Sequence, residues 1–149
     1  MSSGVAHNRG MQALAQFHRW LAWLTLAGFV VQFYLAGLAL FGASTFELHR
    51  ALGYLLVLPV LLLVVLALVR RQRRLIGLTA GLIVLIVVQV LLPGLRTSVP
   101  WLSALHPLNG IALMGLTATI ARAAQPQQAD ARQHGARDVH GVQPVLGSN

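Results

Sequence analysis

Cysteine and lysine are absent from this chain of 149 residues, and acidic residues are few. Because there is no cysteine, the chain has no disulfide, no thiolate metal site, no iron–sulfur cluster and no C-x-x-C-H motif for covalent haem attachment. The acids are Glu47, Asp130 and Asp138, and they stand against 11 basic residues, all arginine, for a formal net charge of +8. In a soluble protein this balance would suggest nucleic acid as a partner.

Charged residues of either sign are scarce, at 9% of the chain, whereas apolar residues make up 56%. Soluble domains carry about 25% charged residues. This composition excludes both an ordinary soluble globule and a disordered chain. Because the arginines lie between long apolar runs, we interpret them as determinants of membrane topology that contact anionic lipid headgroups. We expect a lipid bilayer, and no nucleic acid, as partner.

Four long stretches contain no Asp, Glu, Lys or Arg: Trp20–Phe46, Ala51–Val69, Leu75–Leu95 and Thr97–Ala121. A helix of about 20 residues crosses the hydrocarbon core of a bilayer, and a spanning backbone must form its hydrogen bonds within itself. The sequence therefore predicts an all-α membrane protein, a four-transmembrane-helix bundle with helices near residues 17–41, 48–69, 75–95 and 102–123.

Two tails flank this predicted four-helix domain of residues 13–123. Residues 1–12 are predicted to form a cytoplasmic N-terminal tail. Residues 124–149 are rich in Gln, Ala and Gly and carry charges of both signs. Such a segment cannot bury a core, so we predict a flexible cytoplasmic C-terminal tail.

The arginines gather at one end of the predicted bundle. They lie in the link between the second and third helices and beside the two termini: Arg70, Arg71, Arg73, Arg74, Arg9, Arg19, Arg122, Arg132 and Arg137. The other two loops contain little more than Arg50 and Arg96. The positive-inside rule then predicts a multi-pass protein of the bacterial inner (plasma) membrane with both termini in the cytoplasm. A cleaved signal peptide is disfavoured because the first apolar run is longer than the about 7–15 apolar residues of such signals.

A two-helix unit recurs along the chain with an offset of 57 residues. Both copies contain V-Q-x-x-L-x-G and, after ten further residues, L-H-x-x-x-G, beginning at Val31 and at Val88. Leucine matches are common in so apolar a chain, but matches of Gln, His and two Gly at one offset are not. We interpret the pattern as two parallel two-helix repeats related by a pseudo-two-fold axis along the membrane normal. Coincidence within an apolar, low-complexity composition is the alternative.

The repeat is expected to bring two histidines to one level of the membrane. His49 and His106 each lie near the start of a helix that runs inward from the outer face, and Gly53 and Gly110 follow them by four residues. Residues four apart share a helix face, so each glycine removes a side chain where a flat macrocycle would lie. Two facing imidazoles with cleared helix faces predict one non-covalent haem b, with His49 and His106 as its metal ligands.

Five more residues are candidates for contacts around this haem. Arg50 and Arg96 lie at the outer rim, where the propionates would point. Asn109 follows His106 by three residues and is a candidate to orient that imidazole or to bond a propionate. Gln32 and Gln89 lie deeper, where an unbonded amide is costly. They are therefore expected to bond each other, a ligand histidine or a bound headgroup.

The other titratable groups have simpler interpretations, and a simpler one exists for the histidine pair as well. A histidine near a helix end often lies among lipid headgroups without binding anything. His18 has no histidine partner at its own end of the bundle, so we expect one haem rather than two. Glu47 completes a capping box with Ser44, which favours a structural role over a catalytic one.

The stretches from Phe46 to Arg50 and from Leu105 to Asn109 resemble the histidine-bearing helix starts in one four-helix half of haem A synthase. Small b-type membrane cytochromes are similar in architecture. Over residues 14–123 the chain looks most similar to an uncharacterised family of small four-helix bacterial membrane proteins. The resemblance implies haem binding by this half-fold. Haem A synthase has eight helices and two histidine pairs, so the single pair here does not imply its reaction.

The leading hypothesis is an integral membrane protein with one bis-histidine haem near the outer face. It would transfer electrons to a redox partner or serve as the haem-carrying subunit of a larger membrane complex. We expect no independent catalytic activity, because a six-coordinate iron leaves no open position for a substrate. Two alternatives are a haem-free membrane scaffold or assembly partner, and a quinone- or lipophile-binding protein in which Gln32, Gln89 and the histidines bond carbonyl oxygens.

Overall fold

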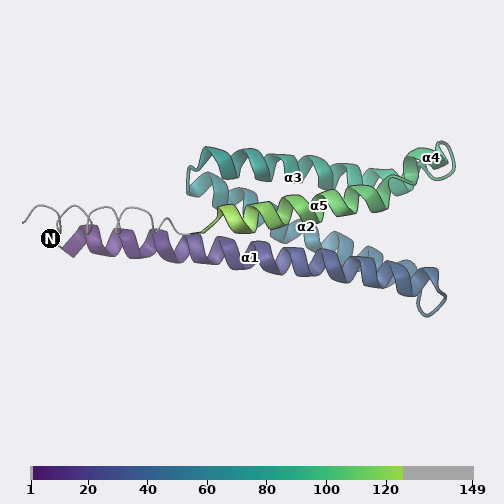
Figure 1. Cartoon of the computed structure of the whole chain (residues 1–149), viewed down its shortest axis with the longest axis horizontal. Helices are drawn as coiled ribbons and strands as arrows, with labels where there is room; N and C mark the ends of the chain where they lie inside the picture. The colour runs from purple at the N-terminus through teal and green to yellow at the C-terminus, as the bar shows by residue number, and fades with distance from the viewer. Residues whose placement is uncertain (1, 126–149) are drawn as a thin grey trace, which may run out of the picture.

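The computed structural model describes residues 2–125, and all regular secondary structure in that range is helical (Figure 1). The elements, in chain order, are α1 (Ser2–Leu40), α2 (Phe46–Val69), α3 (Arg73–Leu91), the 3₁₀ helix η1 (Leu92–Leu95), the single turn α4 (Pro100–Ser103) and α5 (His106–Ala123). Four segments are long and apolar enough to cross a membrane: Arg9–Leu40, Phe46–Val69, Arg73–Leu95 and Pro100–Ala123. The predicted four-helix, all-α membrane fold is confirmed for the described residues.

The long helices run alternately up and down, so the bundle has two distinct ends (Figure 1). We call one the arginine end, because it contains the α2–α3 link of residues 70–72 and the last turn of α5. The other is the histidine end, which contains the α1–α2 loop and the longer connection from α3 through η1 and α4 to α5. His49 and His106 both lie at the histidine end, near the first residues of α2 and α5.

The four long helices form a closed ring. α1 packs against α2 and α5, and α3 packs against the same two helices. α2 and α5 therefore lie on one diagonal of the bundle, and α1 and α3 lie on the other. Side chains that point inward from α2 and α5 consequently meet across the bundle axis. This arrangement is the one that brings His49 on α2 and His106 on α5 together.

The interior is apolar and the exterior is apolar as well. Leu63, Leu82 and Leu113 are fully buried between the helices, whereas Leu24, Leu58 and Val84 are among many large apolar residues that are more than half exposed. An apolar outer surface on this scale is unfavourable in water but matches lipid chains. The exposed surface therefore supports a bilayer as the environment of the protein.

Helix ends differ from the sequence prediction where prolines lie near them. The third helix was expected to reach residue 95, but α3 ends at Leu91, because Pro93 has no N–H to bond the Gln89 carbonyl. The fourth helix was expected from residue 102 onward, but α5 begins at His106 after a break, because Pro107 cannot bond the carbonyl of Ser103.

The first helix begins much earlier than expected. α1 starts at Ser2, so most of the predicted N-terminal tail of residues 1–12 is helical. No proline occurs before Pro59 in the chain, so nothing stops the helix where its apolar run begins. The predicted flexible C-terminal tail falls almost entirely on residues 126–149, which lie outside the described residues, although Ala124 itself is fully buried.

α1 contacts α2 at Gly28. A Cβ atom at this position would lie 2.5 Å from Cδ2 of Leu56, a residue that is 7% exposed. A larger side chain at residue 28 would therefore push the Leu56 side chain aside. Gly77, on α3, is exposed and has no neighbouring atom within 4 Å of the same position.

We expect Gly28→Leu to lower the free energy of unfolding by about 1–3 kcal/mol, because the added side chain overpacks the contact with Leu56. Gly77→Leu is the matched control and should have little effect, since its side chain points into open space. Unfolding by a denaturing detergent, followed by circular dichroism in mild-detergent micelles, measures both. An equal decrease in the free energy of unfolding for the two variants would contradict this account of the α1–α2 contact.

Candidate functional site

The two histidines of the predicted site lie against each other inside the histidine end of the bundle. His49 belongs to the first turn of α2 and His106 is the first residue of α5. Their ring centroids are 6.1 Å apart, with an angle of 66° between the ring planes. Both rings are half-buried. The two rings therefore lie edge to face at one end of the bundle.

Each histidine is held by a backbone carbonyl of the helix beside it. Nδ1 of His49 lies 3.1 Å from the carbonyl oxygen of Gln32 on α1, and Nδ1 of His106 lies 3.1 Å from that of Gln89 on α3. A carbonyl can only accept, so Nδ1 must carry the proton in both rings. In the neutral form of each ring, the lone pair is then on Nε2.

The carbonyl that holds His106 is available because α3 ends beside it. Residue i+4 from Gln89 is Pro93, which has no N–H, so the carbonyl of Gln89 lacks its usual helical partner. The imidazole N–H of His106 takes that place. Gln32 lies within the unbroken helix α1, so its carbonyl accepts from His49 with its second lone pair.

His106 is also part of a closed side-chain network. The amide nitrogen Nε2 of Gln89 donates to Nε2 of His106 at 3.2 Å. The amide group of Asn109 donates to Oε1 of Gln89 at 2.6 Å and to the carbonyl oxygen of Leu85 at 2.9 Å. One assignment of protons satisfies all of these bonds, so the start of α5 is tied firmly to α3.

The corresponding network is missing beside His49. Leu52 occupies the position 57 residues before Asn109 and offers no hydrogen bond. Gln32 is 8% exposed, and within residues 2–125 neither its Nε2 nor its Oε1 has a partner. Burying an unpaired amide is unfavourable by about 1–3 kcal/mol. The protein therefore maintains an unpaired donor and an unpaired acceptor next to the histidine pair.

Gly53 and Gly110 allow neighbouring helices to approach closely, but side chains of those helices occupy the space beside them. A Cβ atom at Gly53 would lie 3.1 Å from Nε2 of Gln32. A Cβ atom at Gly110 would lie 3.0 Å from the Phe33 ring and 3.5 Å from Nε2 of Gln89. The expectation of open helix faces is thus wrong for this structure, because neighbouring side chains pack onto the glycines.

The remaining predicted residues, Arg50 and Arg96, take no part in the hydrogen bonds of the histidines among residues 2–125. Arg50 and Arg96 are exposed at the histidine end, and within residues 2–125 neither forms a hydrogen bond to the site. Sequence reasoning missed two aromatic residues. Phe33 covers Gly110, and Phe46 meets the His49 ring edge-on at a centroid distance of 6.2 Å. Phe33 directly follows Gln32, but nothing in the sequence indicates that it crosses to α5.

The described part of the chain contains no group of three or more His, Cys, Asp or Glu residues that could hold a metal ion. Protein ligands alone would therefore supply only His49 and His106. Structural and catalytic sites for zinc normally have three or four protein ligands. A metal bound here needs further ligands from a cofactor.

A second polar region lies at the arginine end, far from the histidine pair. His18 is fully buried and its Nδ1 accepts from Nη1 of Arg70 at 3.4 Å, while the same Nη1 donates to the carbonyl oxygen of Ala124 at 3.4 Å. Nε2 of His18 then carries the proton and has no partner. Burial lowers the pKa of the Arg70 guanidinium. The sequence showed no histidine partner for His18, and the structure shows that its neighbour is an arginine.

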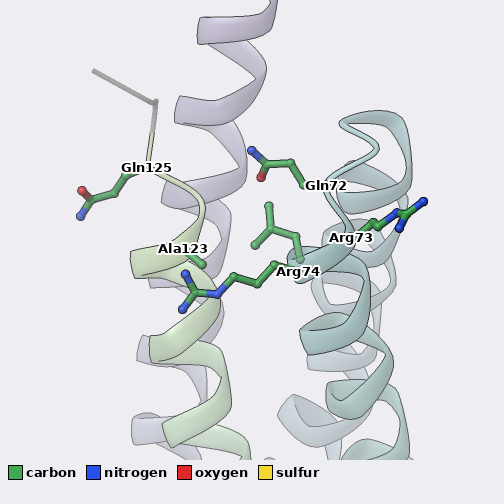
Figure 2. A pocket seen from close by; sticks show the side chains of 6 residues that line it. Gln72, Arg73, Arg74, Ala123 and Gln125 are labelled. Atoms are coloured by element: carbon green, nitrogen blue, oxygen red, sulfur yellow. The ribbon is translucent and has the colours of Figure 1, made fainter. Parts of the chain in front are cut away.

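A hollow of about 370 Å³ also lies at this end, between the start of α3 and the end of α5 (Figure 2). Its lining residues are Gln72, Arg73, Arg74, Leu75, Ala123 and Gln125. Figure 2 shows the Arg74 side chain extending toward the end of α5, whereas Arg73 points the other way. The positive lining suits the anionic lipid headgroups expected at this end.

A second hollow, of about 260 Å³, lies against the last turns of α1 and is lined by Tyr34, Gly37, Leu38 and Phe41. Neither His49 nor His106 lines either hollow.

Comparison with family models shows a match over the middle of the chain. Residues 32–98 are similar to a family of unknown function, DUF6220. The matched segment begins at Gln32, includes His49 and Gln89, and ends before His106. No curated protein and no solved structure matches the chain. The function must therefore be argued from the site.

Replacement of each glutamine by leucine should affect the free energy of unfolding differently. Gln89→Leu removes the partner of both Asn109 and His106, so we expect the free energy of unfolding to fall by about 1–3 kcal/mol. Gln32→Leu removes an amide that has no partner, so stability should be unchanged or should rise by up to about 1 kcal/mol. Detergent unfolding of the protein prepared without added haem compares the pair. Equal destabilisation would show that Gln32 is also paired.

Proposed function

We propose that His49 and His106 are the two axial ligands of one non-covalent haem b, in a membrane protein that transfers electrons or carries haem within a larger complex. The distance between the rings supports this best. Imidazole nitrogens bind first-row metals at about 2 Å, so two rings that share one metal have centres about 6 Å apart. The observed separation is 6.1 Å.

The hydrogen bonds of the rings also support ligation. Histidines that bind metals almost always donate the other ring N–H to a carbonyl or a carboxylate, which fixes the tautomer and makes the ligating nitrogen more basic. His49 and His106 both donate from Nδ1 to a carbonyl. Two independent rings in the same tautomer, on diagonal helices, are what a shared metal requires. The haem supplies the remaining four ligands, which the described residues do not provide.

Haem binding requires three side chains to move: those of Gln89, Phe33 and Gln32, the last of which packs onto Gly53. Nε2 of His106 is bonded to the Gln89 amide, and that bond must break to free its lone pair. The Phe33 ring lies on Gly110 and is 39% exposed, so it can turn outward toward lipid at little cost. The glycines then serve the purpose expected of them, since helix faces without Cβ atoms accept a flat macrocycle.

A bound haem would supply one-electron chemistry, and the residues of the chain would hold and orient it. If His49 and His106 both held the iron, no position would be open for a substrate, which would favour electron transfer over independent catalysis. Arg50 and Arg96 lie at the same end of the bundle and are candidates to bind the propionates. The likeness of the histidine-bearing segments to haem A synthase and to b-type membrane cytochromes supports the same proposal.

Purified protein expressed with haem available should show a b-type band in the reduced-minus-oxidised absorption spectrum. His49→Ala and His106→Ala should each change or abolish the band, because each removes an axial ligand. His18→Ala is the matched control, since His18 is a buried histidine at the opposite end of the bundle. A colourless wild-type protein would defeat the haem proposal.

We further propose that the histidine end faces outward and the arginine end faces the cytoplasm of a bacterial inner membrane. The natural absence of cysteine makes a direct test possible. Ser98→Cys, at the histidine end, should react with a membrane-impermeant maleimide in intact spheroplasts. Gln125→Cys, at the arginine end, should react only after lysis. The reverse pattern would invert the topology and leave the bundle unchanged.

A second candidate ligand is a quinone or another small lipophile. The two unpartnered atoms of Gln32 favour it, because an amide N–H binds the carbonyl oxygen of a quinone well. Mass spectrometry of a lipid extract from the purified protein distinguishes the ligands. A stoichiometric quinone in a colourless protein would favour this candidate. Retention of fold and partner binding by both histidine variants, without any ligand, would favour a haem-free scaffold.

A further inference from the structure

We propose that the hollow at the arginine end binds a phosphate group, supplied by the headgroup of an anionic lipid, with Arg74 as its principal ligand. The hollow lies between the start of α3 and the end of α5 (Figure 2). This site is at the end of the bundle opposite the histidine pair. It therefore does not depend on haem binding and goes beyond the proposed function.

The hollow has the size and the depth expected of a lipid headgroup site. Its volume of about 370 Å³ lies within the range of about 300–1,000 Å³ typical of small-molecule sites. Its α3 wall is formed by the first residues of the span Arg73–Leu95, so it lies at the level where hydrocarbon gives way to headgroups. Leu75 adds a buried apolar residue to the lining. A hollow with both polar and apolar walls suits a lipid phosphate better than free phosphate.

Arg74 is the side chain best placed to bind the phosphate. It lies in the first turn of α3 and extends toward the end of α5 (Figure 2). Within residues 2–125 no side-chain hydrogen bond involves Arg74, whereas Arg70 bonds both His18 and the carbonyl of Ala124. Arg70 therefore ties the end of α5 in place, and the guanidinium of Arg74 remains available. A guanidinium can bind two phosphate oxygens through parallel N–H groups.

The start of α3 supplies backbone donors beside Arg74. The first helical hydrogen bond runs from the N–H of Ile76 to the carbonyl of Gln72, so the N–H groups of Arg74 and Leu75 have no helical partner. Gln72 is the N-cap residue, and its side chain does not bond them. Arg74 and Leu75 both line the hollow. Such N–H groups and the positive end of the helix dipole favour a bound phosphate.

Positive charge at this end is unbalanced among the described residues. Four of the five residues from 70 to 74 are arginine, and Arg73 and Arg74 lie at the positive end of α3. The only acidic residue within 2–125 is Glu47, which lies in the first turn of α2 at the histidine end. Like charges at this spacing repel one another, and a bound anion offsets that repulsion. The lining therefore favours an anionic headgroup over a zwitterionic one.

Native mass spectrometry of the delipidated full chain, prepared without haem, tests this proposal with phosphatidylglycerol as the probe. Arg74→Gln should weaken binding of the first lipid by at least about tenfold, because it removes a charge-assisted hydrogen bond. Arg73→Gln is the matched control: it removes the same charge from the adjacent residue, whose side chain points away from α5. In about 0.5 M ammonium acetate, which screens exposed charges, Arg73→Gln should change binding by less than about twofold.

Two further measurements test the hollow and the source of the phosphate. Ala123→Leu adds bulk to the lining without changing charge, so it should also weaken binding of phosphatidylglycerol. The wild type should bind phosphatidylcholine at least about tenfold more weakly than phosphatidylglycerol, because the net charge of the headgroup is gone. An excess of inorganic phosphate should not displace phosphatidylglycerol, since it lacks the apolar part.

Several results would overturn the proposal. Equal weakening by Arg73→Gln and Arg74→Gln would indicate a diffuse charged surface in place of a site. Unchanged binding by Ala123→Leu would place the lipid outside the hollow, and displacement by inorganic phosphate would exclude a lipid as the source. The haem proposal is tested separately: a colourless protein that binds phosphatidylglycerol in the expected pattern would defeat that proposal and support this one.

Discussion

The requirement that polar groups find partners inside the protein, because lipid offers none, governs this structure. It makes all four spans helical, and it explains the contacts of the side chains that could not be apolar. Thr25, Thr79 and Thr117 are fully buried, and each bonds the carbonyl four residues earlier in its own helix. The site histidines do not bond a carbonyl of their own helix in this way. They form hydrogen bonds to the neighbouring helix instead, and Gln89 does the same. The site is therefore the place where neighbouring helices are joined by hydrogen bonds.

The buried polar atoms that lack a hydrogen-bond partner are therefore the most informative part of the structure. Three buried side-chain atoms lack partners in the described part of the chain: Nε2 of His18 and the two polar atoms of Gln32. Those of Gln32 lie beside a pair of imidazoles whose spacing suits a shared metal. The unpartnered atoms of Gln32 therefore lie on one side of the histidine pair only, because Gln89 on the other side is fully bonded.

Much of this could be predicted from the sequence, because it depends on patterns within single segments. The uncharged runs predict the spans, and the recurring His and Gly place two rings at one end. Contacts between helices could not be predicted in the same way. Asn109 was expected to help orient His106, but its bonds to Gln89 and Leu85 depend on how α3 lies against α5. That Phe33 covers Gly110 depends on side-chain rotamers and on the distance between α1 and α5, and neither follows from residue spacing.

At Pro93, the end of α3 affects the hydrogen bonding of a histidine on α5. By lacking an N–H, Pro93 leaves the carbonyl of Gln89 unbonded within α3, and the imidazole of His106 takes that carbonyl and adopts one tautomer. Pro93 thus ends α3 and leaves His106 a carbonyl without a helical partner, whereas His49 bonds a carbonyl inside the unbroken helix α1. An insertion or deletion between Gln89 and Pro93 would displace that carbonyl and so disrupt the hydrogen bond that orients a ring on a different helix. This stretch should therefore tolerate length variation less than the other loops of the bundle.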